Sequence, residues 1–282
     1  MNWLKKNLST ILLVLALIIG LCLLLYPTVS DYWNSLHQSR AIATYVEQIS
    51  QIDNTRYTEL LQEAKAYNAE LAQRENDDWI LSDEEIDKYN ATLDVSGAGI
   101  MCSIEIPKLK CKLAVYHGVD EGVLQIAVGH VPGSSLPVGG ESTHCVLSGH
   151  RGLPSARLFT DVDKLVVGDT FLINVLDEVL TYEVDQILIV EPYDLSSLEI
   201  VPGEDLVTLV TCTPYGINTH RLLVRGHRIE TAAQARIIRV PADAVQIDPI
   251  LVAPVVAAPI LLLLLLILLM ISNQKPKSKQ RK

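Results

Sequence analysis

A single cysteine lies at the end of a strand-like run in this 282-residue chain, nine residues before an arginine. The run 208–212 reads Thr-Leu-Val-Thr-Cys, and a polar turn at 213–218 leads back into a second apolar run that begins at Arg221. Two antiparallel strands joined in this way place the Cys212 thiol beside the Arg221 guanidinium at one end of a sheet. Such a cation favours the thiolate and binds the oxyanion that forms when a thiolate attacks a carbonyl. The pair indicates thiol acyl transfer, against two plainer interpretations: a small buried Cys212 and a surface or ion-paired Arg221.

A nucleophilic cysteine also requires a proton donor for the leaving amine. Of the seven histidines, His150 follows an apolar strand and lies in a turn flanked by Gly149 and Gly152. These glycines leave the imidazole accessible, so His150 is the candidate acid/base, although a lone histidine is more often structural. His220 neighbours Arg221 and therefore points to the opposite face of its strand.

The cysteines do not form a recognisable disulfide or metal pattern. They are five in number and irregularly spaced, and at least one thiol outside the first apolar run is expected to stay free. A Cys102–Cys111 pair is left open. His144, Cys145 and His150 offer metal-ligand types, but their spacing matches no standard zinc pattern, and no metal site is expected.

The elements that must position these residues are mostly β-strands. Short strand-like runs are separated by clusters of Gly, Pro, Asp and Asn, which indicates a closed barrel or a sandwich. A helical turn is expected at 154–158. The runs are Ile100–Ile106, Leu113–Tyr116, Cys145–Ser148, Thr170–Val175, Thr181–Val190, Leu206–Cys212 and His220–Ile229.

Helices are expected before the strands. Apolar residues recur at steps of three or four between Ile42 and Leu71, and the polar residues 53–55 separate two helices there. Residues 73–98 lack such a period and are predicted to form a long loop with a short helix in it.

Two apolar runs, Leu8–Tyr26 and Ile250–Ile271, are each near the roughly 20 residues needed to cross a bilayer. Lysine and arginine lie on the outer side of both runs, so both termini are predicted to be cytoplasmic and residues 31–249 extracellular. A cleaved signal peptide is the alternative for the first run. The terminal segments hold seven of the 23 basic residues and no acidic ones, which leaves 16 basic against 33 acidic residues outside. Such an acidic exterior argues against nucleic-acid binding.

The motifs around these residues resemble those of the sortase family. Residues 208–212 with Arg221 resemble its TLxTC…R signature, and residues 148–152 resemble its catalytic histidine segment. The longer runs 211–222 and 149–154 are similar to the class C, pilus-assembling group. The resemblance implies an eight-stranded sortase β-barrel with N-terminal helices and a transmembrane helix at each end. It also implies Cys212 as nucleophile, His150 as acid/base and Arg221 as stabiliser of the substrate or the oxyanion.

The chemistry implied by the resemblance is a cofactor-free transpeptidation. Its substrate is an LPxTG-like sorting signal of a pilin, cleaved between Thr and Gly through a thioacyl-enzyme. A lysine amine of another pilin subunit then resolves this intermediate. The partners are therefore pilin subunits and membrane lipid, and the place is the cell membrane of a Gram-positive bacterium. The alternatives are a non-catalytic module that binds sorting peptides or scaffolds assembly, a hydrolytic cysteine peptidase, and a housekeeping sortase that anchors proteins to the cell wall.

Class C relatives carry a lid over the active site, usually Asp-Pro-aromatic, and Asp77-Asp78-Trp79 occupies the corresponding place here. The resemblance puts Asp77 against Arg221 and Trp79 over Cys212. Asp78 replaces the usual proline, which removes a fixed φ angle. The predicted division of the chain is a first span within 1–30, helices at 31–72, a lid loop at 73–98, a barrel at 99–232, a linker at 233–249, a second span at 250–272 and a basic tail at 273–282.

Overall fold

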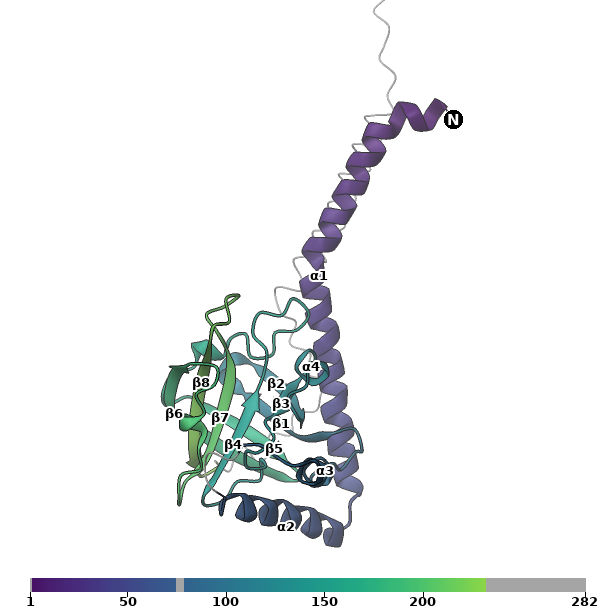
Figure 1. Cartoon of the computed structure of the whole chain (residues 1–282). Helices are drawn as coiled ribbons and strands as arrows, with labels where there is room; N and C mark the ends of the chain where they lie inside the picture. The colour runs from purple at the N-terminus through teal and green to yellow at the C-terminus, as the bar shows by residue number, and fades with distance from the viewer. Residues whose placement is uncertain (1, 75–78, 232–282) are drawn as a thin grey trace, which may run out of the picture. The chain divides into compact units, whose positions relative to one another are not determined.

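The computed structural model describes residues 2–74 and 79–231. Among these described residues, those up to Ser30 belong to one compact unit and residues 31–231 belong to another. The unit that begins at Asp31 contains a closed eight-stranded barrel, drawn in teal and green in Figure 1. A closed barrel leaves no sheet edge unpaired, and it decides between the two predicted β architectures.

The strands follow each other around the barrel in the order β1-β2-β3-β4-β7-β8-β6-β5. The β2–β3 and β4–β7 pairs are parallel, and the other pairs are antiparallel. The strands are β1 (Ile100–Ile106), β2 (Cys111–His117), β3 (Val128–His130), β4 (Thr143–Ser148), β5 (Thr170–Val175), β6 (Glu178–Val190), β7 (Asp205–Thr213) and β8 (His220–Ile229).

The barrel interior is apolar because alternate strand residues point inward. In β5, burial alternates along the whole strand, with Phe171, Ile173 and Val175 inside. The predicted strand runs match seven of the observed strands to within three residues at each end. The prediction missed β3, because three residues that include a glycine carry no readable alternation.

In the described part of the chain, four α-helices accompany the strands: α1 (Asn2–Gln51), α2 (Asn54–Leu71), α3 (Asp83–Ala91) and α4 (Glu121–Leu124). The Asp53 side chain accepts a hydrogen bond from the Arg56 amide and caps α2, which confirms the predicted break between the first two helices. The N-terminal part of α1 is long and apolar enough to cross a membrane, and its apolar stretch is not buried in the protein. The predicted second span, the linker and the basic tail lie outside the described residues.

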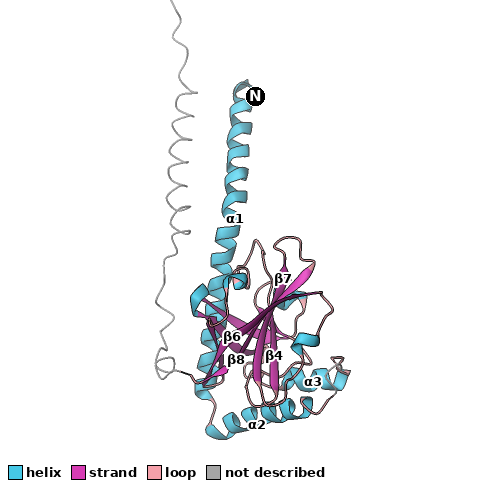
Figure 2. Ribbon diagram, turned by 90° about the vertical axis from the view of Figure 1, so that its left-hand side faces the viewer, coloured by secondary structure: helices cyan, strands magenta, loops and turns pink. Residues whose placement is uncertain are grey.

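The helices of the second unit are tied to the barrel by polar contacts. The Tyr45 hydroxyl of α1 donates to the Met101 carbonyl at 2.8 Å and accepts from the Leu176 amide at 2.9 Å. The Asn68 amide of α2 exchanges two hydrogen bonds with the Leu136 backbone. In Figure 2, α2 and α3 lie at one end of the magenta strands.

The segment predicted as a helical turn at 154–158 is different. Residues 154 and 155 form a tight turn closed by an isolated antiparallel bridge between Leu153 and Ala156. The prediction of a helical turn there was wrong, because only two residues lie between the paired Leu153 and Ala156, which is too few for an i to i+4 bond.

Candidate active site

Cys212 and Arg221 are register partners on β7 and β8. Residues directly opposite each other in an antiparallel pair project to the same face of the sheet. On β7 the neighbouring Thr211 is buried while Cys212 is only half-buried, so this face is the outer one. The Arg221 Nη1 group donates to the His220 carbonyl at 3.2 Å. The thiol and the guanidinium are therefore neighbours on one face, as the strand pattern predicted.

His150 reaches the same level from the other side of β7. The parallel β4–β7 ladder ends at the Ser148–Val210 pair, and the Gly149 amide continues it by donating to the Val210 carbonyl at 3.1 Å. The Thr211 hydroxyl in turn donates to the Gly149 carbonyl at 2.8 Å. These bonds bring His150, which follows Gly149, level with Cys212, with its side chain 28% exposed.

Gly149 has a steric reason to lack a side chain. A Cβ atom at this position would lie 2.7 Å from the ring of the fully buried Phe159. The Phe159 amide also donates to the His150 carbonyl at 3.1 Å. The His150 turn therefore packs directly on the core. This packing fixes the backbone of His150 at the barrel surface.

A second, smaller apolar cluster covers the outer face beside Cys212, and we call it the outer cluster. Val210 and Leu223 are the register pair two residues before Cys212 and two after Arg221, so they belong to the same face. Trp79 packs against this cluster, and Gly133 makes room for it, because a Cβ there would lie 3.2 Å from the Trp79 carbonyl oxygen. The outer cluster consists of Val146, Leu198 and Leu223, with Trp79, Val131, Leu188, Val190 and Val210 packed against them.

The outer cluster was not predicted from the sequence. Its members come from β4, β6, β7, β8, two loops and the short 3-10 helix Ser196–Leu198, so only the order of strands around the barrel brings them together. One signal was available: Val190 and Val210 are apolar at strand positions that face away from the core. Asp77 and Asp78 of the predicted lid lie outside the described residues, and Trp79 is its described member.

The other thiols of the barrel are not comparable with Cys212. Cys102 and Cys145 are buried, and burial raises the pKa of both well above the usual range. Burial also raises the pKa of Cys111 to about 11. All five cysteines are free, so the Cys102–Cys111 pair left open by the sequence is not formed.

His144 and His130 are structural. Nε2 of His144 lies 2.7 Å from the Thr208 hydroxyl and Nδ1 lies 2.8 Å from the Glu199 carbonyl, so both nitrogens have partners. His130 is fully buried against Tyr89 and the Ser135 carbonyl. Burial lowers the pKa of each to about 4 and keeps both imidazoles neutral. Among the described residues, no group of side chains is arranged to hold a metal ion.

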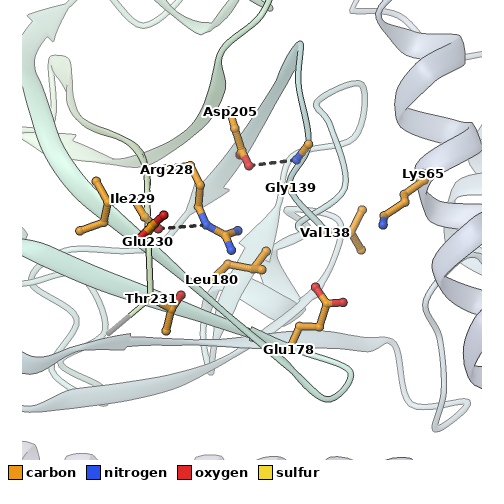
Figure 3. Close-up of a pocket in the computed structure, with 11 residues that line it drawn as sticks. Lys65, Val138, Gly139, Glu178, Leu180, Asp205, Arg228, Ile229, Glu230 and Thr231 are labelled. Carbon is orange, nitrogen blue, oxygen red and sulfur yellow. Dashed lines mark hydrogen bonds between the residues drawn. The ribbon is translucent and has the colours of Figure 1, made fainter. Parts of the chain in front are cut away.

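A pocket of about 940 Å³ lies at the other end of the barrel. Figure 3 shows Arg228 and Asp205 among its lining residues, with Lys65 of α2 at its edge. Asp205 begins β7 and Arg228 nearly ends β8, whereas Cys212 and Arg221 lie at the opposite ends of these strands. The pocket is therefore separate from the cysteine site.

Comparison with known proteins agrees with this geometry. The Sortase domain model matches residues 104–229. The crystal structure of sortase C1 from Streptococcus agalactiae is 51% identical, with a TM-score of 0.67, and the match covers 68% of this chain and 100% of that one. Sortase C of Streptococcus pneumoniae is 44% identical, with a TM-score of 0.61, over 69% and 98% of the two chains. Sortase C-1 of Actinomyces oris is 41% identical, with a TM-score of 0.58, over 62% and 99%.

Similarity to curated proteins is lower and partial. Sortase D of Bacillus subtilis is 30% identical over 129 residues, which is 45% of this chain and 62% of the relative. Sortase A of Streptococcus agalactiae is 26% identical over 47% of this chain and 54% of the relative. This chain thus spans about half to three fifths of the length of these two relatives. Because the 51% identity to sortase C1 extends over the whole length of that structure, the chain belongs to the sortase family of cysteine transpeptidases, within its class C group.

Proposed function

We propose that this protein is a membrane-anchored class C sortase that joins pilin subunits through their sorting signals. The observation that carries the proposal is the placement of Cys212 opposite Arg221 on β7 and β8, with His150 level with Cys212 at the end of the parallel neighbour β4. These three side chains supply the nucleophile, the cation and the proton donor of thiol acyl transfer.

The first step forms a thioacyl-enzyme. The Cys212 proton passes to His150, and the sulfur attacks the threonine carbonyl carbon of the Thr–Gly bond in an LPxTG-like signal, so that an S–C bond forms. The Arg221 guanidinium stabilises the oxyanion of the tetrahedral intermediate. The C–N bond then breaks, and His150 donates a proton to the departing glycine amine.

The second step transfers the acyl group to an amine. A lysine ε-amine of another pilin subunit attacks the thioester carbon and forms an isopeptide C–N bond. The thiolate of Cys212 leaves, and His150 takes the proton that the amine loses. Atoms and charges balance without a further reactant.

The lid is part of the proposal. Trp79 packs on the outer cluster, whose Val210–Leu223 pair adjoins the Cys212–Arg221 pair. A peptide that approaches Cys212 along this face has to displace Trp79. The proposed Asp77–Arg221 contact involves a residue outside the described part of the chain and stays a prediction.

The location follows from the apolar runs. The apolar stretch of α1 provides one span, and the run 250–272 provides the second, so residues 31–249 lie outside the cell with both termini in the cytoplasm. This arrangement would present the acidic barrel to secreted pilins at the surface of a Gram-positive bacterium.

The experiment is an intact-mass measurement on the full chain after incubation with an LPxTG-type peptide. The Trp79→Ala variant is used to expose the thiol, and Cys212→Ala in the same background is the control. The proposal expects a mass increase equal to the N-terminal acyl fragment of the peptide, absent in the control. A thiol that alkylates readily and never acquires this fragment would instead favour a non-catalytic peptide-binding domain.

The remaining alternatives differ in the acceptor. Addition of a pilin lysine peptide to the preformed thioacyl-enzyme should give an isopeptide product, as a pilus-assembling sortase requires. Water as the sole acceptor would indicate a peptidase. Transfer to a cell-wall precursor amine in preference to lysine would indicate a housekeeping sortase.

A further inference from the structure

Arg151, which directly follows His150, is more deeply buried than its type and position suggest. Its side chain is 10% exposed, and its guanidinium forms an ion pair with Asp163. Its Nε group is buried without a hydrogen-bond partner in the described part of the chain. An ion pair alone explains neither the burial nor the unsatisfied donor, since a surface arginine keeps its donors in water.

The second contact of Arg151 is with the loop that follows Cys212. The guanidinium carbon lies 5.6 Å from the centroid of the Tyr215 ring, within the range of a cation–π interaction. Tyr215 lies between β7 and β8, three residues after Cys212 and six before Arg221. The contact therefore joins the turn that carries His150 to the hairpin that carries the other two site residues.

Gly152 shows that the turn is shaped around this ring. A Cβ atom at Gly152 would lie 2.9 Å from Cε2 and 3.0 Å from Cζ of Tyr215, and the φ angle of +77° also disfavours a side chain there. The Gly152 amide donates to the Thr160 hydroxyl at 3.1 Å, which holds the turn in place from the other side. Arg151 and Gly152 thus both contact the Tyr215 ring.

No other backbone pairing spans this position. The β4–β7 ladder ends at Ser148–Val210, and past the Gly149–Val210 bond no ladder pair joins the His150 turn to the β7–β8 loop in residues 79–231. The Thr211–Gly149 and Phe159–His150 hydrogen bonds hold the base of the turn, and beyond them the turn meets the β7–β8 loop through the contacts of Arg151 and Gly152 with Tyr215.

We propose that Arg151 and Tyr215 form a clamp that keeps His150 aligned with the Cys212–Arg221 pair. Both are positioning residues that act through the site residues. The inference rests on the proposed function, because alignment matters only if His150 exchanges protons at Cys212. Misplacement of a catalytic group by about 1 Å can cost a large factor in rate, so loss of the clamp should lower the rate of acylation more than it weakens peptide binding.

The test compares thioacyl formation by the full chain and its variants with an LPxTG-type peptide. Tyr215→Ala removes the ring, and Arg151→Lys keeps a charge near Asp163 but replaces the planar guanidinium that lies over the ring with a smaller ammonium group. Each is expected to lower kcat about tenfold with KM within about twofold of wild type. Tyr215→Phe keeps the ring and should restore most of the rate. The double variant should lose no more than the worse single variant, because both remove one contact.

The chain offers a matched control. Arg228 lies over the Tyr182 ring at the same 5.6 Å, at the other end of the barrel. Arg228→Lys changes an equivalent contact. It should lower thermal stability about as much as Arg151→Lys does, but it should leave kcat unchanged. Equal effects at the two ends would reduce the clamp to a general contribution to stability and overturn the proposal.

Three further outcomes contradict the clamp. A rise in KM without a fall in kcat would make Tyr215 a peptide contact instead. Losses that multiply in the double variant would show that the two residues act independently, and a Phe variant as poor as Ala would exclude stacking.

A second readout requires no peptide. The rate of Cys212 alkylation against pH, followed by mass spectrometry of the Cys212-containing fragment, should change shape in Arg151→Lys and Tyr215→Ala but not in Arg228→Lys. If the wild type never forms a thioacyl-enzyme but these profiles differ as stated, the proposed function fails and the clamp stands. If the thioacyl-enzyme forms and all profiles coincide, the clamp fails and the function stands.

Discussion

Glu121 is the charged residue whose carboxylate lies 3.8 Å from Nε2 of His150. Its side chain is 74% exposed, and ion pairs at such positions contribute little because water and salt screen them. We predict that Glu121→Gln changes the rate of thioacyl formation by less than about twofold at physiological salt. Single-turnover acylation of the full chain at neutral pH measures this. A tenfold loss would instead make Glu121 part of the machinery that orients His150.

The buried histidines make a residue-scale prediction about acid stability. Burial lowers the pKa of His130 and His144 to about 4, below the value of 6.5 that holds in the unfolded chain. The unfolded state therefore binds more protons between these values, so the stabilisation is complete above pH 6.5 and is lost as pH falls toward 4. Each group contributes at most about 3 kcal/mol.

His144→Asn tests this linkage, since asparagine offers a donor and an acceptor but does not titrate. We expect the thermal midpoint of the full chain to be higher for wild type at pH 7.5, and the gap between the two proteins to narrow as pH falls to 4.5. The carboxylates of the chain also change its stability with pH, but they are the same in both proteins, so their contribution cancels in the difference between the two thermal midpoints. Parallel curves over this range would show that His144 is not held neutral by the fold.

At the scale of elements, α3 is anchored to the barrel, and Trp79 of the proposed lid lies just before it. Ser82 and Glu85 form a capping box at its start, and the buried Tyr89 hydroxyl donates to the His130 carbonyl at 3.0 Å and accepts from the Gly118 amide at 3.0 Å. Trp79 precedes the cap by three residues and packs against the outer cluster and the loop around Gly133. Lid opening should therefore move Trp79 while α3 stays in place.

This arrangement predicts different effects for two aromatic substitutions. Trp79→Ala should raise the alkylation rate of Cys212 about tenfold. This factor corresponds to a lid that, in the wild type, exposes the thiol about a tenth of the time. Asp77→Ala should act in the same direction. Tyr89→Phe should lower thermal stability, since it leaves buried polar groups unpaired, without speeding alkylation. Equal labelling rates in wild type and in the Asp77 and Trp79 variants would exclude a working lid.

At the scale of the whole molecule, attachment to a membrane depends on segments outside the barrel. Asp31 is the first residue of the barrel unit, and its carboxylate accepts a hydrogen bond from the Arg157 amide at 2.8 Å. The packed part of the chain therefore begins a few residues after the first apolar run. With two spans, removal of residues 1–30 should leave the protein in the membrane fraction after alkaline extraction. Removal of both 1–30 and 250–282 should release it. Release by the first deletion alone would show that the run 250–272 does not span the bilayer.

Part of this structure could be predicted because it depends on local patterns. Strand positions follow from alternation over five or more residues, and the break before α2 follows from Asp53 as a cap. The neighbouring positions of Cys212 and Arg221 follow from a single hairpin, whose register depends on residues close in sequence.

The tertiary structure decided what depends on distant contacts. The closure order of the strands brings His150 to Cys212, assembles the outer cluster around Trp79, and makes His130 and His144 buried supports instead of ligands. The cation–π contact of Arg151 with Tyr215 joins residues 64 positions apart in the sequence. No local sequence pattern contains such pairs, because their members are far apart in the sequence and meet only when the strands close into the barrel. The sequence by itself thus determined the elements and the reactive groups, and the fold determined which of those groups meet.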